Sequence, residues 1–109
     1  MEKFTVIAGK PRITKDPQAV LDYGVDWGPW LKPLGDSIVS HQVFPAGVVL
    51  DSSAVVDGED EDQQPVPDGM VAMWISGGTA GSVASAVVQI TTAAGRTDER
   101  TVYFVIKNR

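Results

Sequence analysis

His41 is the only histidine in the chain, so a site for nucleophilic catalysis of the Ser-His-Asp type has to be built around it. Nearby serines, Ser37 and Ser40, supply a hydroxyl, and nearby aspartates, Asp36 and Asp51, supply a group that orients an imidazole. No serine stands in the glycine-flanked turn that exposes a nucleophile in hydrolases. A lone histidine within a strand-forming run is usually a surface or cross-strand residue, and we predict no catalytic triad.

An acidic segment between Asp57 and Asp68 has enough carboxylates for a calcium ion, which binds oxygen ligands. The EF-hand pattern requires ligands at alternate positions and a glycine at the sixth. Here the carboxylates are contiguous and Gly58 comes too early. We expect no metal and no other cofactor, and we interpret this segment as a solvated loop or as a charged surface that faces a partner.

Two further patterns are weak signals of chemistry. Asp22 and Asp26 lie on one face of a strand-forming segment, as paired glycosidase carboxylates would, but Trp27 points to the opposite face and offers them no sugar platform. Solvation of the strand face is the simpler interpretation. The glycine-rich segment 77–81 lacks the Lys-Ser/Thr pair of a phosphate-binding loop and is typical of a turn. We therefore predict that the protein is not an enzyme.

Charge and composition argue against other classes. The chain has 14 acidic and 9 basic residues, for a formal charge of -5, which disfavours contact with a phosphate backbone. Cysteine is absent, so disulfides, thiolate nucleophiles and cysteine-based metal sites are absent too. The apolar stretch at the N-terminus is too short for a signal-peptide core or a membrane span. We expect no nucleic-acid or membrane partner, and synthesis in the cytoplasm.

The elements that would position these residues are strands. Val, Ile and Thr dominate the apolar runs, Gly or Pro interrupts them at short intervals, and no window carries a sustained helical repeat. The strongest hairpin spans residues 82–106. This pattern predicts an all-β fold, an immunoglobulin-like antiparallel β-sandwich of about six to seven strands.

One core is expected for a chain of 109 residues. We divide the chain into an N-terminal lead-in arm, residues 1–15, and a single sandwich domain, residues 16–109, with an acidic loop at residues 57–69. Aromatic residues within the predicted strands are expected to fill the core between the sheets: Tyr23, Trp27, Trp74 and Phe104.

Two groups of motifs carry a resemblance to a known family. The first, within residues 15–31, contains KDP, VLDY and DW; the second, WISGGTAG at residues 74–81, leads into ITTAAGRTDER at residues 90–100. In this order and spacing the chain resembles, over residues 14–107, a family of small virion proteins of tailed bacteriophages. These are described as fibre–tail adaptor or neck proteins with an immunoglobulin-like fold. The segment 57–68 is longer and more acidic than the family pattern.

The resemblance implies a structural protein of the virion tail or neck, made in the host cytoplasm. It implies several symmetric copies that contact other virion proteins, including the tail fibre. Two alternatives stay open: a capsid decoration or cement protein, and a carbohydrate-binding module that uses Trp30 as its platform.

The candidate contact residues come from two charged segments. The predicted hairpin tip has both charge signs, which suits charge-assisted contacts across a protein interface and is also ordinary for a solvated turn. The acidic loop and one tryptophan complete the set: Arg96, Asp98, Glu99, Arg100, Glu59, Asp60, Glu61, Asp62 and Trp30.

Overall fold

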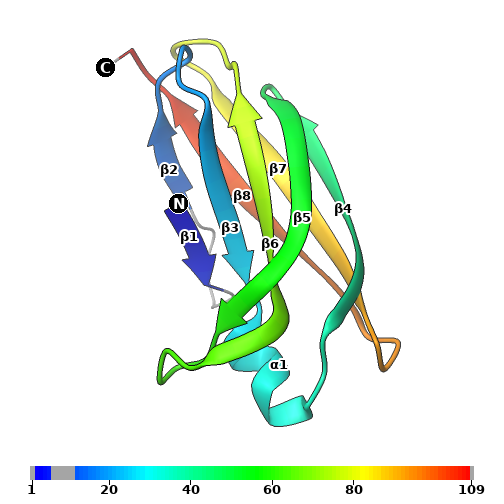
Figure 1. The fold of residues 1–109 in the computed structure, drawn as a ribbon. Coiled ribbons are helices and arrows are strands. Elements are labelled where there is room, and N and C mark those ends of the chain that lie inside the picture. The colour runs from blue at the N-terminus through cyan, green and yellow to red at the C-terminus, as the bar shows by residue number, and fades with distance from the viewer. Residues whose placement is uncertain (1, 6–11, 109) are drawn as a thin grey trace.

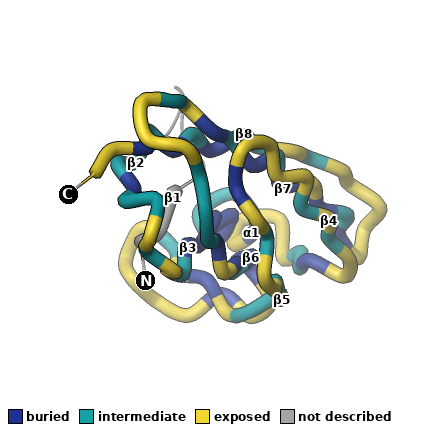
Figure 2. Tube along the Cα trace, turned by 90° about the horizontal axis from the view of Figure 1, so that it is seen from above, coloured by how far each residue is buried: buried dark blue, intermediate teal, exposed yellow. Residues whose placement is uncertain are grey.

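Two four-stranded sheets pack face to face in the structure, a computed structural model that describes residues 2–5 and 12–108 (Figures 1 and 2). The strand orders are β1-β3-β6-β5 and β2-β8-β7-β4. The elements are β1 (Glu2–Thr5), β2 (Arg12–Lys15), β3 (Leu21–Asp26), α1 (Gly28–Leu34), β4 (Ile38–Ala46), β5 (Val49–Glu59), β6 (Pro65–Ser76), β7 (Val83–Thr92) and β8 (Thr97–Ile106). The predicted all-β sandwich is confirmed, with six longer strands and two of four residues.

The N-terminal segment belongs to the sandwich instead of leading into it as an arm. β1 pairs in parallel with β3, and β2 pairs in parallel with β8, so the segment contributes to both sheets. Lys15, at the end of β2, is fully buried, and its Nζ donates to the carbonyls of Asp16 (2.9 Å) and Gly77 (2.7 Å). Burial lowers the pKa of Lys15, while the carboxylates of Asp16 and Asp51 oppose that shift. Residues 1 and 6–11 of the predicted arm lie outside the described residues.

Alternation along the strands builds the core. In β8, Val102, Phe104 and Ile106 face inward and are fully buried, as the period of two predicts. Tyr23 and Trp27 also have no exposed surface, and the rings of Tyr23 and Phe104 meet edge to face with centroids 5.0 Å apart. Each such side chain stabilises the fold by about 1.5–3 kcal/mol through burial.

Trp74 was predicted to lie in the core, and this is wrong. Its side chain is 47% exposed on the outer face of β6, between Asp22 of β3 and Ser52 of β5. The run Met70–Ile75 is apolar at every position, so the sequence does not define which parity faces inward. The structure turns Met73 and its odd-numbered neighbours inward, and Trp74 therefore points out.

The short helix α1 was not predicted, because seven residues are too few to show a helical repeat. Pro29 stands in its first turn, where proline is tolerated, and Gly35 closes it in the left-handed conformation with φ 61°. Leu31 is fully buried in the core, so it packs the helix against one end of the sandwich.

The acidic segment 57–69 forms a shorter loop than predicted. β5 continues to Glu59 and β6 begins at Pro65, and these two residues pair, which leaves a turn of residues 60–64. A bulge near Gly58 lets β5 keep pairing as the strands bend. The acidic side chains therefore lie at the tip of a long hairpin.

Candidate partner-binding site

Three elements meet at one end of the sandwich, at the bottom of Figure 1. They are α1, the β5–β6 turn (residues 60–64) and the β7–β8 turn (residues 93–96), and we call this region the helix end. Most of the candidate contact residues lie on or beside it. Whether each side chain is available to a partner depends on what it already binds within the chain.

Asp26 organises the base of the helix end. It is 1% exposed, its Oδ1 accepts the N–H of Gly28 at 2.7 Å, and its Oδ2 accepts the N–H of Glu59 at 3.0 Å. One carboxylate thus joins the end of β3, the start of α1 and the end of β5. The interpretation of Asp26 as a solvated strand-face residue is wrong, because the strand ends beneath the returning β5–β6 hairpin.

Two glycines are required around this carboxylate, because the backbone passes too close to it for a side chain. A Cβ at Gly58 would lie 2.3 Å from Asp26 Oδ1, and a Cβ at Gly28 would lie 2.1 Å from the carbonyl oxygen of Glu59. Neither position has space for a side chain. The backbone amides can therefore reach the carboxylate only with these two glycines.

Asp98 links the two sheets near the same end. The indole Nε1 of Trp27 donates to Asp98 Oδ2 at 2.9 Å, and Arg100 donates to Asp98 Oδ1 at 3.0 Å. These residues lie within β8 and not at the hairpin tip, since β8 begins at Thr97. Asp98 and Arg100 therefore have internal roles, whereas Glu99 is exposed on the outer face of the sheet.

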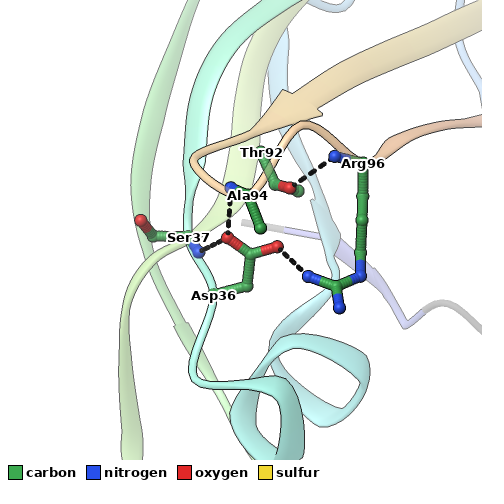
Figure 3. A network of polar contacts seen from close by, with 5 residues as sticks. All are labelled: Asp36, Ser37, Thr92, Ala94 and Arg96. Carbon is green, nitrogen blue, oxygen red and sulfur yellow. Dashed lines mark hydrogen bonds and ion pairs between the residues drawn. The ribbon is translucent and has the colours of Figure 1, made fainter.

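Asp36 holds the β7–β8 turn against the link between α1 and β4 (Figure 3). Its carboxylate accepts the N–H groups of Ser37 (2.9 Å) and Ala94 (3.2 Å) and the guanidinium of Arg96 (2.9 Å). A hydrogen bond with the Thr92 side chain, followed by those from Ser37, Arg96 and Ala94, lowers the pKa of Asp36 to about 2, although burial opposes the shift. The Arg96 side chain is thus engaged in shaping the turn.

The β5–β6 turn presents the more available carboxylates. Asp60 accepts the N–H groups of Asp62 (2.8 Å) and Gln64 (2.9 Å), and it lies 3.9 Å from Nζ of Lys32 on α1. Asp60 therefore stabilises the turn, and Glu61 and Asp62 are exposed beside it. A shallow hollow of about 190 Å³ separates the turn from the helix; it is lined by Pro29, Lys32, Pro33, Asp60, Glu61 and Asp62.

The described residues contain no group of three or more histidine, cysteine, aspartate or glutamate side chains placed to hold a metal ion. His41 lies on β4, with its Nε2 2.9 Å from Ser53 Oγ on β5. Since β4 and β5 are the edge strands of the two sheets, this bond is a cross-strand link between the sheets.

Trp30 is half-buried on α1 and packs against the core, so it offers only part of its ring to a partner. More exposed apolar side chains lie on the outer sheet faces, where the sequence did not indicate them. Trp74 on β6, Phe44 on β4 and Val83 on β7 are 47%, 51% and 55% exposed. A strand period could have placed Phe44 and Val83 outside the core, but it gives no sign of which outward residues form one surface.

No helix among the described residues is long and apolar enough to cross a membrane. Among solved structures, the chain is similar to the crystal structure of the cysteine protease inhibitor EhICP2 from Entamoeba histolytica. The TM-score is 0.53 at 8% identity, with 97% of this chain and 94% of that chain covered. This likeness shows the fold alone. No curated protein matches the chain.

The sequence family gives a more specific result than the fold. Residues 15–105 match the family described as podophage GP4 fiber-tail adaptor protein gp77. This range includes both groups of motifs that carried the resemblance, and it covers most of the chain. The chain therefore belongs to the podophage GP4 fibre–tail adaptor family.

Proposed function

We propose that this protein joins tail fibres to the neck or tail of a podophage particle by protein–protein contacts, without catalysing a reaction. The observation that carries the proposal is the family match over residues 15–105, which supports a structural role in the virion tail. The nearest alternative is a capsid decoration protein, which would use the same fold on the capsid lattice.

The helix end is the surface we assign to one virion partner. The contacts of Asp26, Asp36 and Asp98 fix its three segments before any partner binds, so little ordering entropy is lost on association. Glu61 and Asp62 present exposed negative charge there. A basic surface on the partner is the complement, and such contacts chiefly raise the rate of association.

The immunoglobulin-like character of the sandwich is also a proposal. When β3, β6 and β5 are taken as strands B, E and D, and β4, β7 and β8 as C, F and G, the sheet orders correspond to the ABED and CFG sheets of immunoglobulin constant domains. Two features depart from that antiparallel pattern: β1 pairs with β3 in parallel, and β2 adds a fourth strand that pairs in parallel with β8.

Copy number and gene deletion test the role. Quantitative mass spectrometry of purified particles should find roughly six to twelve copies if cyclic symmetry at the neck or tail sets the number. Electron microscopy of particles from a deletion strain should show missing fibres, restored by the wild-type gene. Hundreds of copies per particle, or complete fibres without the gene, would refute the adaptor role.

Charge reversal tests the helix end. Asp62→Lys should reduce fibre attachment in complemented particles and make it less sensitive to salt, because it removes favourable long-range attraction. The double variant Gln18→Lys, Thr79→Lys is the matched control, since it changes the net charge by the same amount through exposed residues on loops outside the helix end. Equal fibre attachment in the two variants would assign the contact to another surface.

A further inference from the structure

The outer face of the β2-β8-β7-β4 sheet forms a second surface, distinct from the helix end. In β7 and β8 the even-numbered residues from Ala84 to Thr92 and from Val102 to Ile106 are buried, so the odd-numbered residues point outward. On β4 the outward residues are those that pair with them, such as Phe44 opposite Val87. The other sheet lies on the opposite side of this one (Figure 2).

Charge is almost absent from this outer face, although the chain has a net charge of -5. The only charged side chains at its outward positions among the described residues are Arg12 of β2 and Glu99 of β8, which have opposite signs. Phe44 and Val83 are more than half exposed there. Depletion of charge together with exposed aromatic and aliphatic side chains is typical of the centre of a protein interface.

The two halves of the face differ in shape. One half carries Tyr103 and Val83, with Arg12 lying 5.8 Å from the centre of the Tyr103 ring. The other half has two hollows of about 300 and 250 Å³ on either side of Gln89, the second of which Glu99 also lines. Two copies of this face can place the Tyr103 half of one against the hollowed half of the other only if the second copy is turned around.

We propose that this face binds the same face of a second copy, about a two-fold axis that crosses the strands at Thr101. Thr101 pairs with Val87, which pairs with Phe44, so one row of residues crosses three strands along the axis. The rotation exchanges the row of Tyr103 with the row of Glu99. It places Tyr103 of each copy over the hollow beside Glu99 of the other, as an isologous interface requires.

The same rotation brings the two charges together. Arg12 is in register with Tyr103, so it comes to the level of the other copy's Glu99. It is displaced sideways by one strand spacing of about 4.8 Å, which an arginine side chain spans. Two symmetric Arg12–Glu99 pairs then lie at the β2–β8 side of an otherwise uncharged face, so the proposed occupant is complementary in charge.

The area of the face permits a reversible dimer. Three long strands of nine or ten residues and one of four, at about 4.8 Å between strands and 3.3 Å per residue, give roughly 520 Å² per copy. The total of roughly 1,050 Å² for two copies just reaches the 1,000 Å² or so that a specific interface needs, and it lies below the usual range for obligate dimers.

Analytical ultracentrifugation of the purified chain from about 1 μM to 1 mM tests the proposal, the range in which interfaces of this size associate. We expect a reversible shift from monomer to dimer. Arg12→Glu should weaken association by about tenfold or more, and the double variant Arg12→Glu, Glu99→Arg should restore it, because the charge pair is rebuilt with its sign exchanged. Both are surface residues, and circular dichroism should show an unchanged fold.

Trp74→Ser is the matched control, because it removes an exposed aromatic side chain from the other sheet and should leave dimerisation unchanged. A monomer at every concentration would overturn the proposal and leave the face to a different protein. A dimer that Arg12→Glu does not weaken, or that the double variant does not restore, would place self-association on another surface. These results test the dimer and leave the family match over residues 15–105 unaffected, since the copy-number and deletion experiments test the fibre role separately.

Discussion

Replacing Asp26 by asparagine tests the claim that this carboxylate holds the helix end together. The substitution keeps the size of the side chain but exchanges one acceptor oxygen for an amide donor. Because both oxygens of Asp26 accept backbone N–H groups, either Gly28 or Glu59 then faces a donor. The variant loses one bond to a charged acceptor, and it buries one N–H group without its partner.

The expected cost follows from those two changes. A hydrogen bond to a charged group contributes about 1.5–3 kcal/mol, and an unsatisfied buried donor costs about 1–3 kcal/mol. Burying a neutral amide in place of a carboxylate offsets part of this cost, since charge is the more expensive group to bury. We therefore expect a loss of about 2–3 kcal/mol, which corresponds to a fall in Tm of roughly 8–12 °C for a domain of this size.

Urea unfolding measures this difference, with the m-value checked for constancy. Asp22→Asn is the control, because it is the same substitution at an earlier position on the same strand, one that is only half-buried. The control should stay within about 0.5 kcal/mol of the wild type, as surface changes usually do. The reasoning fails if Asp26→Asn also stays within that limit, or if the two variants lose equal stability.

Three further changes test other contacts at this end. Asp36 has a pKa of about 2, below its ordinary value of 3.8, so the stability it contributes is complete above that ordinary value and is lost as the pH falls towards 2. Thermal melts of Asp36→Asn and the wild type should therefore differ most above pH 4 and converge near pH 2; a constant difference would contradict this origin. Trp27→Phe removes the bond to Asp98 and should lower the free energy of unfolding by about 1.5–3 kcal/mol in urea titrations; no loss would mean that this bond is not a link between the sheets. Gly58→Ala places a methyl group against Asp26 and should lower the free energy of unfolding by about 1–3 kcal/mol in urea titrations. An unchanged urea midpoint would rule out this clash.

The parts of the fold that the sequence predicts are those governed by local alternation. In β8, Val102, Phe104 and Ile106 alternate with less apolar residues, so one face is defined and the structure buries it. Trp74 shows where the same rule fails, because its neighbours Met73 and Ile75 are as apolar as Trp74 itself. The choice between two apolar faces is made by the packing of the opposite sheet, which local sequence does not contain.

The candidate site was harder to predict because its main contacts join distant segments. Asp26 binds Glu59, and Asp36 binds Arg96, across separations of 33 and 60 residues. Charged residues at a hairpin tip look available for a partner until the fold supplies an internal one, as it does for Arg96. The glycines were the one local sequence signal near Asp26. From sequence alone Gly28 is equally consistent with an ordinary turn, because the sequence does not show that the β5–β6 hairpin packs against it.

The direction of the proposed two-fold axis has a consequence for how an adaptor would work. An axis that crosses the strands reverses the strand direction in the second copy, so the two helix ends of a dimer point in opposite directions. Each helix end presents Glu61 and Asp62, and the dimer therefore offers two equivalent acidic surfaces, one at either end. A protein that bridges two virion components needs two separated contacts, which one copy of the helix end does not provide. Arg12→Glu particles should accordingly retain a folded protein but lose bridging, whereas Asp62→Lys weakens the individual contacts and leaves the dimer intact.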